Sequence, residues 1–161
     1  MEPNAAEPSR RVAKSVARRG SSQSLGDSSL MAVEFDIRGT VLKYSALGAE
    51  RLRIIQHSGD FALSGIRRGV VFVFAVWSGP SVQALQRFTR VLATIELGSL
   101  DVIILDNDCI TDDDKMRVFG HVFHGAGEVL WIRDGQVIAE LSAYRQESEP
   151  LILSHTKALL V

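Results

Sequence analysis

The chain has 161 residues, of which 46% are hydrophobic and 23% are charged, and its formal net charge is −1. This composition is typical of one globular domain with its own core, and the small net charge disfavours nucleic acid as the main partner. The single cysteine, Cys109, excludes an intramolecular disulfide, and the longest apolar run, Val70–Trp77, is far shorter than a membrane span. We therefore expect no membrane partner and a reducing, cytoplasmic location.

Residues 1–30 differ in composition from the rest of the chain. They hold seven serines, five basic residues and hardly any large apolar side chain. Such a segment buries too little surface to offset the entropy of ordering it, so we expect a disordered tail followed by one domain over residues 31–161. A Ser- and Arg-rich start is also typical of an organelle transit peptide, but Glu2 and Glu7 argue against that alternative.

The first elements expected after the tail are short strands. Val33–Ile37 and Thr40–Tyr44 are apolar stretches around an Arg-Gly break, and they predict an N-terminal β extension. Arg51–Gln56 predicts another strand. Ser58–Asp60 offers capping side chains for a short helix that runs to about Gly65.

The central pattern is a strand, a helix and a second strand. Val70–Val76 is a continuous run of β-branched and aromatic residues, typical of a parallel strand that is buried on both faces. Apolar residues then recur at steps of three and four between Val82 and Ile95, which predicts an amphipathic helix. With a strand at Val102–Leu105, this succession indicates a right-handed parallel crossover.

The last third of the chain predicts a helix, a hairpin and a final helix. Thr111, followed by three aspartates, is typical of a capped helix start, and we expect that helix to end near Gly120. Val129–Ile132 and Gln136–Tyr144 flank an Asp-Gly pair, which indicates an antiparallel hairpin. Ser148 and the proline that follows it predict the start of the last helix.

This order of elements, together with the loop Trp77–Ser81 after the central strand, resembles the thioredoxin family. The resemblance covers residues 51–161. The family's Trp-Cys-Gly-Pro-Cys motif occupies the place of this loop, and the Trp, Gly and Pro are retained here. The resemblance implies a thioredoxin-like three-layer α/β/α fold with a mixed central sheet.

Three departures from the family pattern predict that the redox chemistry is lost. Ser78 and Ser81 replace the two cysteines, so no disulfide can form or exchange at this loop. Phe72 stands where the family has a buried proton-handling acid. The family's cis-proline aligns with Gly125–Glu128, at Gly127, and we expect a trans peptide there because a cis bond before another residue costs about 2.5 to 4 kcal/mol.

We interpret the chain as a redox-inactive thioredoxin-like module that binds another protein, because cysteine-free members of this superfamily typically act by binding, as chaperone, assembly factor, scaffold or inhibitor. A large aromatic side chain at the carboxyl end of a parallel strand lies where open α/β folds bind ligands. We expect no catalytic residue, no metal and no cofactor. The expected binding surface consists of Trp77, Ser78, Gly79, Pro80, Ser81, Gly127 and Glu128.

Two alternative functions follow from single residues. Ser78, near a helix start, is placed like the serine with which some glutathione transferases hold a thiol, so a glutathione- or thiol-binding enzyme is the first alternative. Cys109 precedes a helix start, which lowers the pKa of a thiol, so a one-thiol redox protein is the second.

Two clusters of polar residues invite a metal-site interpretation, and both have simpler explanations. The acidic stretch Asp106–Asp114 lacks the glycine and the final glutamate of a calcium-binding loop, so helix capping explains it better. We also expect Asp106 to accept a hydrogen bond from the Trp77 indole. His121 and His124 lie close together in the sequence, but no third metal ligand accompanies them. Their position near the C-terminal end of the expected helix, where a histidine is favoured electrostatically, explains them without a metal.

Overall fold

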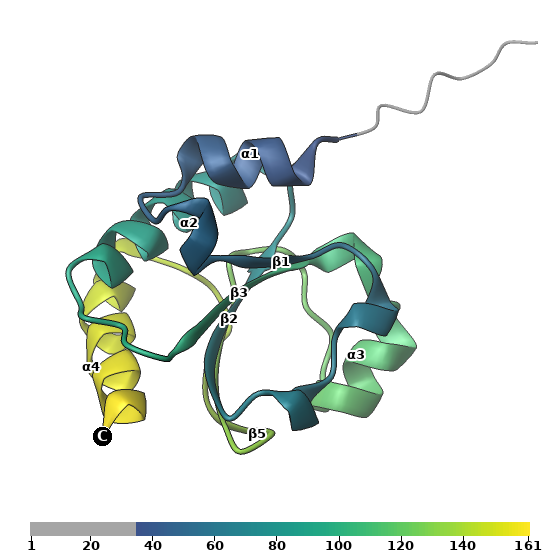
Figure 1. The fold of residues 1–161 in the computed structure, drawn as a ribbon. Helices are drawn as coiled ribbons and strands as arrows, with labels where there is room; N and C mark the ends of the chain where they lie inside the picture. Colours follow the sequence, from purple (N-terminus) through teal and green to yellow (C-terminus); the bar gives the residue numbers. More distant parts are fainter. Residues whose placement is uncertain (1–34) are drawn as a thin grey trace, which may run out of the picture. The chain divides into compact units, whose positions relative to one another are not determined.

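The centre of the fold is a mixed five-stranded sheet in a computed structural model that describes residues 35–161 (Figure 1). The sheet has the order β1-β3-β2-β4-β5. The strands are β1 (Arg53–Ile55), β2 (Arg68–Phe74), β3 (Asp101–Asp106), β4 (Val129–Arg133) and β5 (Gln136–Leu141). β1, β3 and β2 are parallel, and β4 is antiparallel to both β2 and β5. The mixed sheet and the β2-to-β3 crossover are therefore confirmed.

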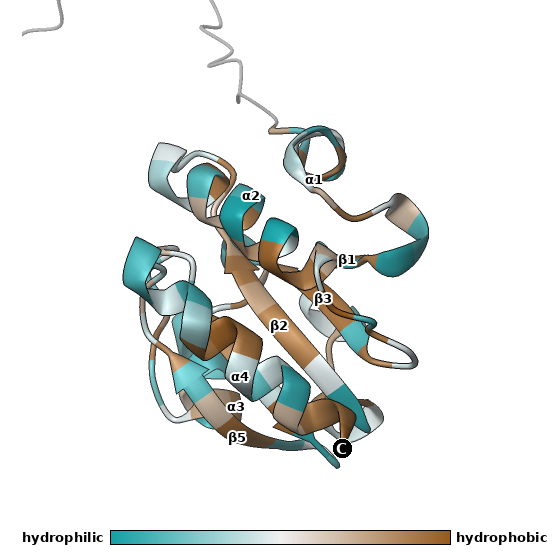
Figure 2. Ribbon diagram, turned by 90° about the vertical axis from the view of Figure 1, so that its left-hand side faces the viewer, coloured by the Kyte–Doolittle hydropathy of each residue, from teal (hydrophilic) through white to brown (hydrophobic). Residues whose placement is uncertain are grey.

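Helices cover both faces of this sheet and complete the three layers. They are α1 (Ile37–Tyr44), α2 (Gly79–Ala93), α3 (Asp112–Phe119) and α4 (Glu149–Leu160). Buried side chains of α1, α2 and α4 share one apolar cluster with one face of the sheet. The other face packs against a second cluster that includes Phe119 of α3. Figure 2 shows α2 and α4 on the same face of the sheet, with apolar β2 between them.

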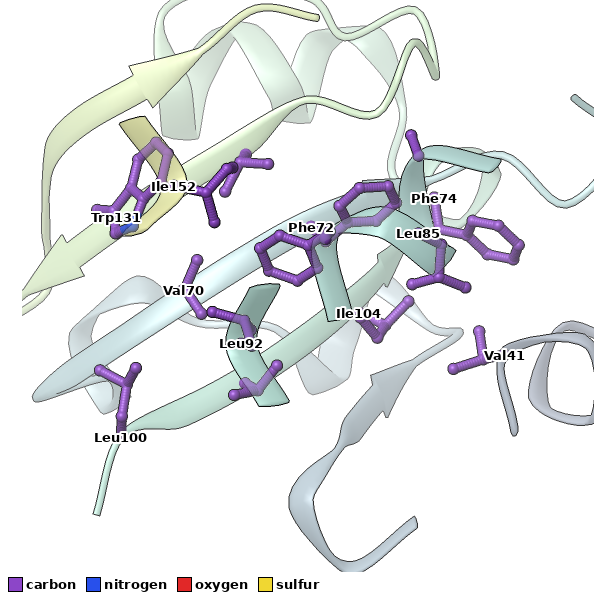
Figure 3. Close-up of a cluster of buried hydrophobic side chains, with 14 of the residues drawn as sticks. Val41, Val70, Phe72, Phe74, Leu85, Leu92, Leu100, Ile104, Trp131 and Ile152 are labelled. Atoms are coloured by element: carbon purple, nitrogen blue, oxygen red, sulfur yellow. The ribbon is translucent and has the colours of Figure 1, made fainter. Parts of the chain in front are cut away.

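The core is densest around β2, whose last residues are buried on both sides. The Phe72 ring lies 5.0 Å from that of Phe88 on α2 and 6.5 Å from that of Phe74, measured between ring centroids. Figure 3 shows Phe72 and Phe74 together with Val70, Leu92 and other buried side chains of the larger cluster. A continuous β-branched and aromatic run therefore forms the central strand, as its sequence predicts.

The expected N-terminal β extension is wrong, because Ile37–Tyr44 forms α1. Asp36 caps this helix: its Oδ1 accepts a hydrogen bond from the Gly39 N–H at 2.8 Å. Ile37 and Val41, four residues apart, are the buried residues of the helix and join the main core. One buried face at helical spacing outweighs the β-branched composition that suggested strands. Val33 and Glu34, like the expected disordered tail, lie outside the described residues.

The helix expected from Ser58 to about Gly65 is also wrong. The segment forms two separate 3-10 turns, Ser58–Asp60 and Leu63–Gly65. Neither turn has a side-chain cap, and each ends after three residues in extended backbone. Glycine at two positions of this short stretch disfavours a continuous α-helix.

The remaining elements agree with the predictions in type, although the strand predicted over Arg51–Gln56 is limited to β1 (Arg53–Ile55) because Arg51 belongs to a 3-10 turn. α2 begins with proline in its first turn, and Gly120, with a φ of +80°, ends α3 in the left-handed conformation. The hairpin turn has positive φ at both Asp134 and Gly135, as a tight two-residue turn requires. β5 ends at Leu141, before the predicted boundary. No helix within residues 35–161 has the length and apolar character needed to cross a membrane.

Candidate functional site

The loop that follows β2 forms the capped start of α2. The Ser78 Oγ accepts a hydrogen bond from the Ser81 N–H at 3.3 Å, and Gly79 and Pro80 lie in the first turn. Ser81 is completely buried, and its Oγ accepts a hydrogen bond from the Ala75 N–H at 3.1 Å. The two serines that replace cysteines therefore satisfy backbone N–H groups at the strand-to-helix turn.

Trp77 is the more exposed of the two tryptophans, and its indole N–H has a hydrogen-bond partner. Its side chain is 53% exposed, whereas Trp131 is 1% exposed. The Trp77 Nε1–H donates a hydrogen bond to the Asp108 Oδ2 at 2.7 Å. The expectation that Asp106 would accept this bond is wrong, because the Asp106 Oδ1 accepts from the Asp108 N–H at 3.0 Å and caps the 3-10 turn there. The indole therefore has one defined partner and an accessible ring.

The 3-10 turn that holds Asp108 is itself anchored by a buried lysine. Lys115 of α3 is 4% exposed, and its Nζ donates hydrogen bonds to the Asn107 Oδ1 at 3.1 Å and the Asp112 Oδ1 at 3.3 Å. Sequence reasoning missed this contact, since a lysine in an acidic first turn is typical of a solvated helix face. The Asn107 Nδ2–H in turn donates a hydrogen bond to the Asp108 Oδ1 at 3.1 Å, so a chain of hydrogen bonds links Lys115 of α3 to the Trp77 indole.

Gly127 is packed so tightly that a side chain at its place would force its neighbours to shift. Its φ is +78°, whereas proline requires about −65°. A Cβ at this position would lie 2.7 Å from the Ala84 Cβ and 3.0 Å from the Tyr144 Cβ. The backbone at the position of the family's cis-proline is therefore one that proline cannot adopt.

Three residues of the expected binding surface are not accessible. Gly127, Glu128 and Ser81 are all buried. The Glu128 Oε1 accepts a hydrogen bond from the His124 N–H at 2.7 Å, and its carbonyl accepts from the Val73 N–H at 2.9 Å. Of these three residues only Ser81 bonds to the turn that carries Trp77, and the accessible part of the predicted set is Trp77–Pro80.

A groove between α1 and the start of α2 adjoins this loop. It has a volume of about 760 Å³. Its lining residues are Asp36, Gly39, Thr40, Lys43, Tyr44, Val76, Gly79, Val82 and Gln83. Sequence reasoning missed the α1 side because it predicted strands there. The sequence pattern that predicts α1 is the capping residue Asp36 followed by Ile37 and Val41, two apolar residues spaced four apart.

The two single-residue alternatives differ in what the structure says of them. The Ser78 Oγ accepts the hydrogen bond of the helix cap, which leaves its O–H available to donate, and no base among residues 35–161 is hydrogen-bonded to it. The Cys109 Sγ lies 3.8 Å from the Ile55 carbonyl oxygen, and burial, with a contribution from Asp106, raises the pKa of the thiol to about 11. At pH 7, about one thiol in 10,000 is then ionised.

The acidic and histidine clusters serve as caps and a surface contact. The Thr111 Oγ1 accepts a hydrogen bond from the Asp114 N–H at 3.1 Å, which confirms the predicted cap of α3. α3 ends before His121 and His124, and the His121 Nε2 lies 2.8 Å from the Glu140 Oε1. In the part of the chain that the structure describes, no three potential ligands gather around a common metal position.

Comparisons with known proteins agree with this architecture. No protein-family model and no curated protein matches the chain. Thioredoxin O2 from Arabidopsis thaliana, in its oxidised state, is 14% identical, and the match covers 65% of this chain and 92% of that chain with a TM-score of 0.52. Thioredoxin from Plasmodium falciparum is 14% identical over 63% of this chain and 96% of that chain, with a TM-score of 0.51.

A third solved structure covers more of the chain. Mitochondrial thioredoxin 3 from Saccharomyces cerevisiae is 12% identical over 74% of this chain and 98% of that chain, with a TM-score of 0.50. Likeness at such low identity concerns the fold alone. The fold is thioredoxin-like, as the resemblance of the sequence implies.

Proposed function

We propose that this chain is a redox-inactive thioredoxin-like module that binds another protein through the surface around Trp77–Pro80. The observation on which the proposal rests is the Trp77 residue, which is 53% exposed and donates a hydrogen bond to Asp108. A ring that is already bonded in one orientation loses less conformational entropy on binding than a free ring, and tryptophan is enriched among the residues that dominate binding energy. A role as chaperone, assembly factor, scaffold or inhibitor fits such a surface.

The groove between α1 and α2 extends this surface beside the loop. Its volume of about 760 Å³ lies within the roughly 300 to 1,000 Å³ that is typical of ligand sites. Val76 and Val82 contribute apolar lining, while Asp36 and Lys43 contribute charges of both signs. We infer that a partner places apolar side chains against Trp77 and Val82, with polar groups toward α1.

The chemistry of the loop supports binding without redox turnover. Ser78 and Ser81 provide no sulfur, and Phe72, where the family has its acid, is completely buried among other aromatic rings. The one thiol, Cys109, is largely protonated at neutral pH because its pKa is about 11. A cytoplasmic location fits a chain with a single cysteine.

The proposal is tested by quantitative affinity capture from the native cell with three forms of the chain. Trp77→Ala removes the exposed ring, and Leu151→Ala, which truncates a side chain on α4 that is 49% exposed, is the matched control. We expect a specific partner to bind the Trp77→Ala variant at least tenfold more weakly and the Leu151→Ala variant normally. Normal recovery by the Trp77→Ala variant would exclude this surface.

Two activity measurements separate the proposal from its alternatives. We expect no reduction of insulin disulfides, because the loop contains no thiol pair. A ligand that binds the folded chain raises its melting temperature. Because the proposal includes no glutathione site, we expect millimolar glutathione to leave the melting temperature unchanged. A clear rise that the Ser78→Ala variant abolishes would instead establish the thiol-binding alternative.

A further inference from the structure

The one buried residue of α3 is a lysine. Lys115 is 4% exposed, and lysine is among the residues that are almost never fully buried unless a partner binds them. Its Nζ lies 3.1 Å from the Asn107 Oδ1 and 3.3 Å from the Asp112 Oδ1. The Asp112 side chain is largely exposed, whereas Asn107 is buried. The partner that shares the burial of the lysine is therefore Asn107.

The lysine fixes the orientation of the Asn107 amide. An ammonium group only donates hydrogen bonds, so the amide turns its oxygen toward Lys115. The amide nitrogen then faces the other way, and Nδ2–H donates a hydrogen bond to the Asp108 Oδ1 at 3.1 Å. A reversed amide would place its oxygen against the Asp108 carboxylate and its N–H groups against the lysine, and both contacts would be repulsive.

The orientation of Asp108 matters for Trp77 because the hydrogen bond between them is exposed to solvent. Water competes for both groups of such a bond, so its net stabilisation is small. The bond is favoured when the carboxylate is already held in place. The Asn107 amide binds the Oδ1 of that carboxylate, which leaves Oδ2 to accept from the indole at 2.7 Å. The Asp108 backbone is held in addition by the Asp106 Oδ1.

We propose that Lys115 and Asn107 are positioning residues of the Trp77 surface. Lys115 orients the Asn107 amide, the amide orients the Asp108 carboxylate, and the carboxylate holds the indole. Both positioning residues are buried, so they control the presentation of the ring without touching a partner. Their effect on binding rests on the proposed function, whereas their effect on the orientation of the ring does not, and each effect has its own measurement.

Time-resolved fluorescence anisotropy tests the proposal without a partner, in a Trp131→Phe background that leaves Trp77 as the one tryptophan. Asn107→Asp keeps an acceptor for Lys115, and so keeps the anchor of α3, but places a second carboxylate against Asp108. We expect this variant to add a nanosecond component of ring motion, the timescale of freely rotating exposed side chains, to the anisotropy decay. Lys115→Met, which removes the donor, should add the same component, and so should Asp108→Ala.

Gln136→Glu and Lys157→Met make the same chemical changes at exposed positions, and we expect both controls to keep the wild-type decay. An unchanged decay in the Asn107→Asp variant, or the new component in either control, would overturn the positioning role.

A binding measurement tests the consequence for a captured partner. We expect the Asn107→Asp variant to bind it roughly threefold more weakly, because a free ring must be ordered on binding. Wild-type affinity of this variant, for a partner that Trp77→Ala loses, would refute the control of binding by Asn107. Normal binding by Trp77→Ala would refute the proposed function instead, while the anisotropy decay still decides whether the two residues position the ring.

Discussion

Replacing Gly127 with alanine tests how tightly the segment before β4 is packed. The new methyl group would lie 2.7 Å from the Ala84 Cβ and 3.0 Å from the Tyr144 Cβ, in a backbone with a φ of +78°. A left-handed backbone costs a non-glycine residue about 1 kcal/mol, and overpacking a core costs about 1 to 3 kcal/mol. We therefore expect the free energy of unfolding to fall by about 2 to 4 kcal/mol, which lowers the melting temperature by roughly 10 °C.

Two other glycines separate these contributions in the same denaturation assay. Gly98 has a φ of +53° with open space around it, so Gly98→Ala measures the backbone cost alone, about 1 kcal/mol. Gly59 has neither a positive φ nor a close neighbour, and Gly59→Ala should change stability by less than about 0.5 kcal/mol. If Gly127→Ala destabilises the chain no more than Gly98→Ala does, the close packing of Gly127 is refuted.

A double-mutant cycle identifies the neighbour responsible. Ala84→Gly removes the Cβ that a residue at position 127 would meet, at the cost of a glycine within α2, about 1 kcal/mol. We expect the two substitutions together to be less destabilising than the sum of the single effects, by about 1 kcal/mol or more. Additive effects would contradict a contact between positions 84 and 127.

Three further outcomes follow from the site. The Ser78→Cys, Ser81→Cys double variant should remain inactive in insulin reduction, because Phe72 still replaces the acid; turnover would contradict this. The rate of alkylation of Cys109 by iodoacetamide should rise tenfold per pH unit to well beyond pH 9, because the pKa of the thiol is about 11. A rate that reaches a plateau near pH 8 would show an activated thiol instead. Burial raises the pKa of Asp106 above its usual 3.8, so its charged form opposes folding. Asp106→Asn should therefore stabilise the chain at pH 7, and this gain should vanish below the usual pKa in urea titrations; a gain unchanged at pH 3 would contradict the charge effect.

The sequence predicts the sheet well because each main strand has a strong local pattern. Val70–Val76 is apolar throughout, and the Asp-Gly pair between β4 and β5 specifies their turn without long-range information. α1 was missed because its apolar residues are few and β-branched, so only their burial against the core distinguishes a helix from two short strands.

The contacts of the candidate site are harder to predict from sequence because they join distant segments. The retained loop residues indicate where Trp77 lies. That Asp108 and not Asp106 accepts its hydrogen bond depends on the 3-10 turn that follows β3. The anchor of that turn, Lys115, has no local signature. The burial of Glu128 likewise follows from its bond to the His124 N–H, which no periodicity reveals.

The most direct test of the central claim is the fluorescence of Trp77 as a captured partner is added. The chain has two tryptophans, so a Trp131→Phe variant isolates the emission of Trp77. Because the ring is 53% exposed, its emission should be quenched readily by acrylamide in the free chain. We predict that the partner shifts this emission to shorter wavelength and protects it from quenching. Saturating partner that leaves both the wavelength and the quenching of Trp77 unchanged would contradict binding at this surface.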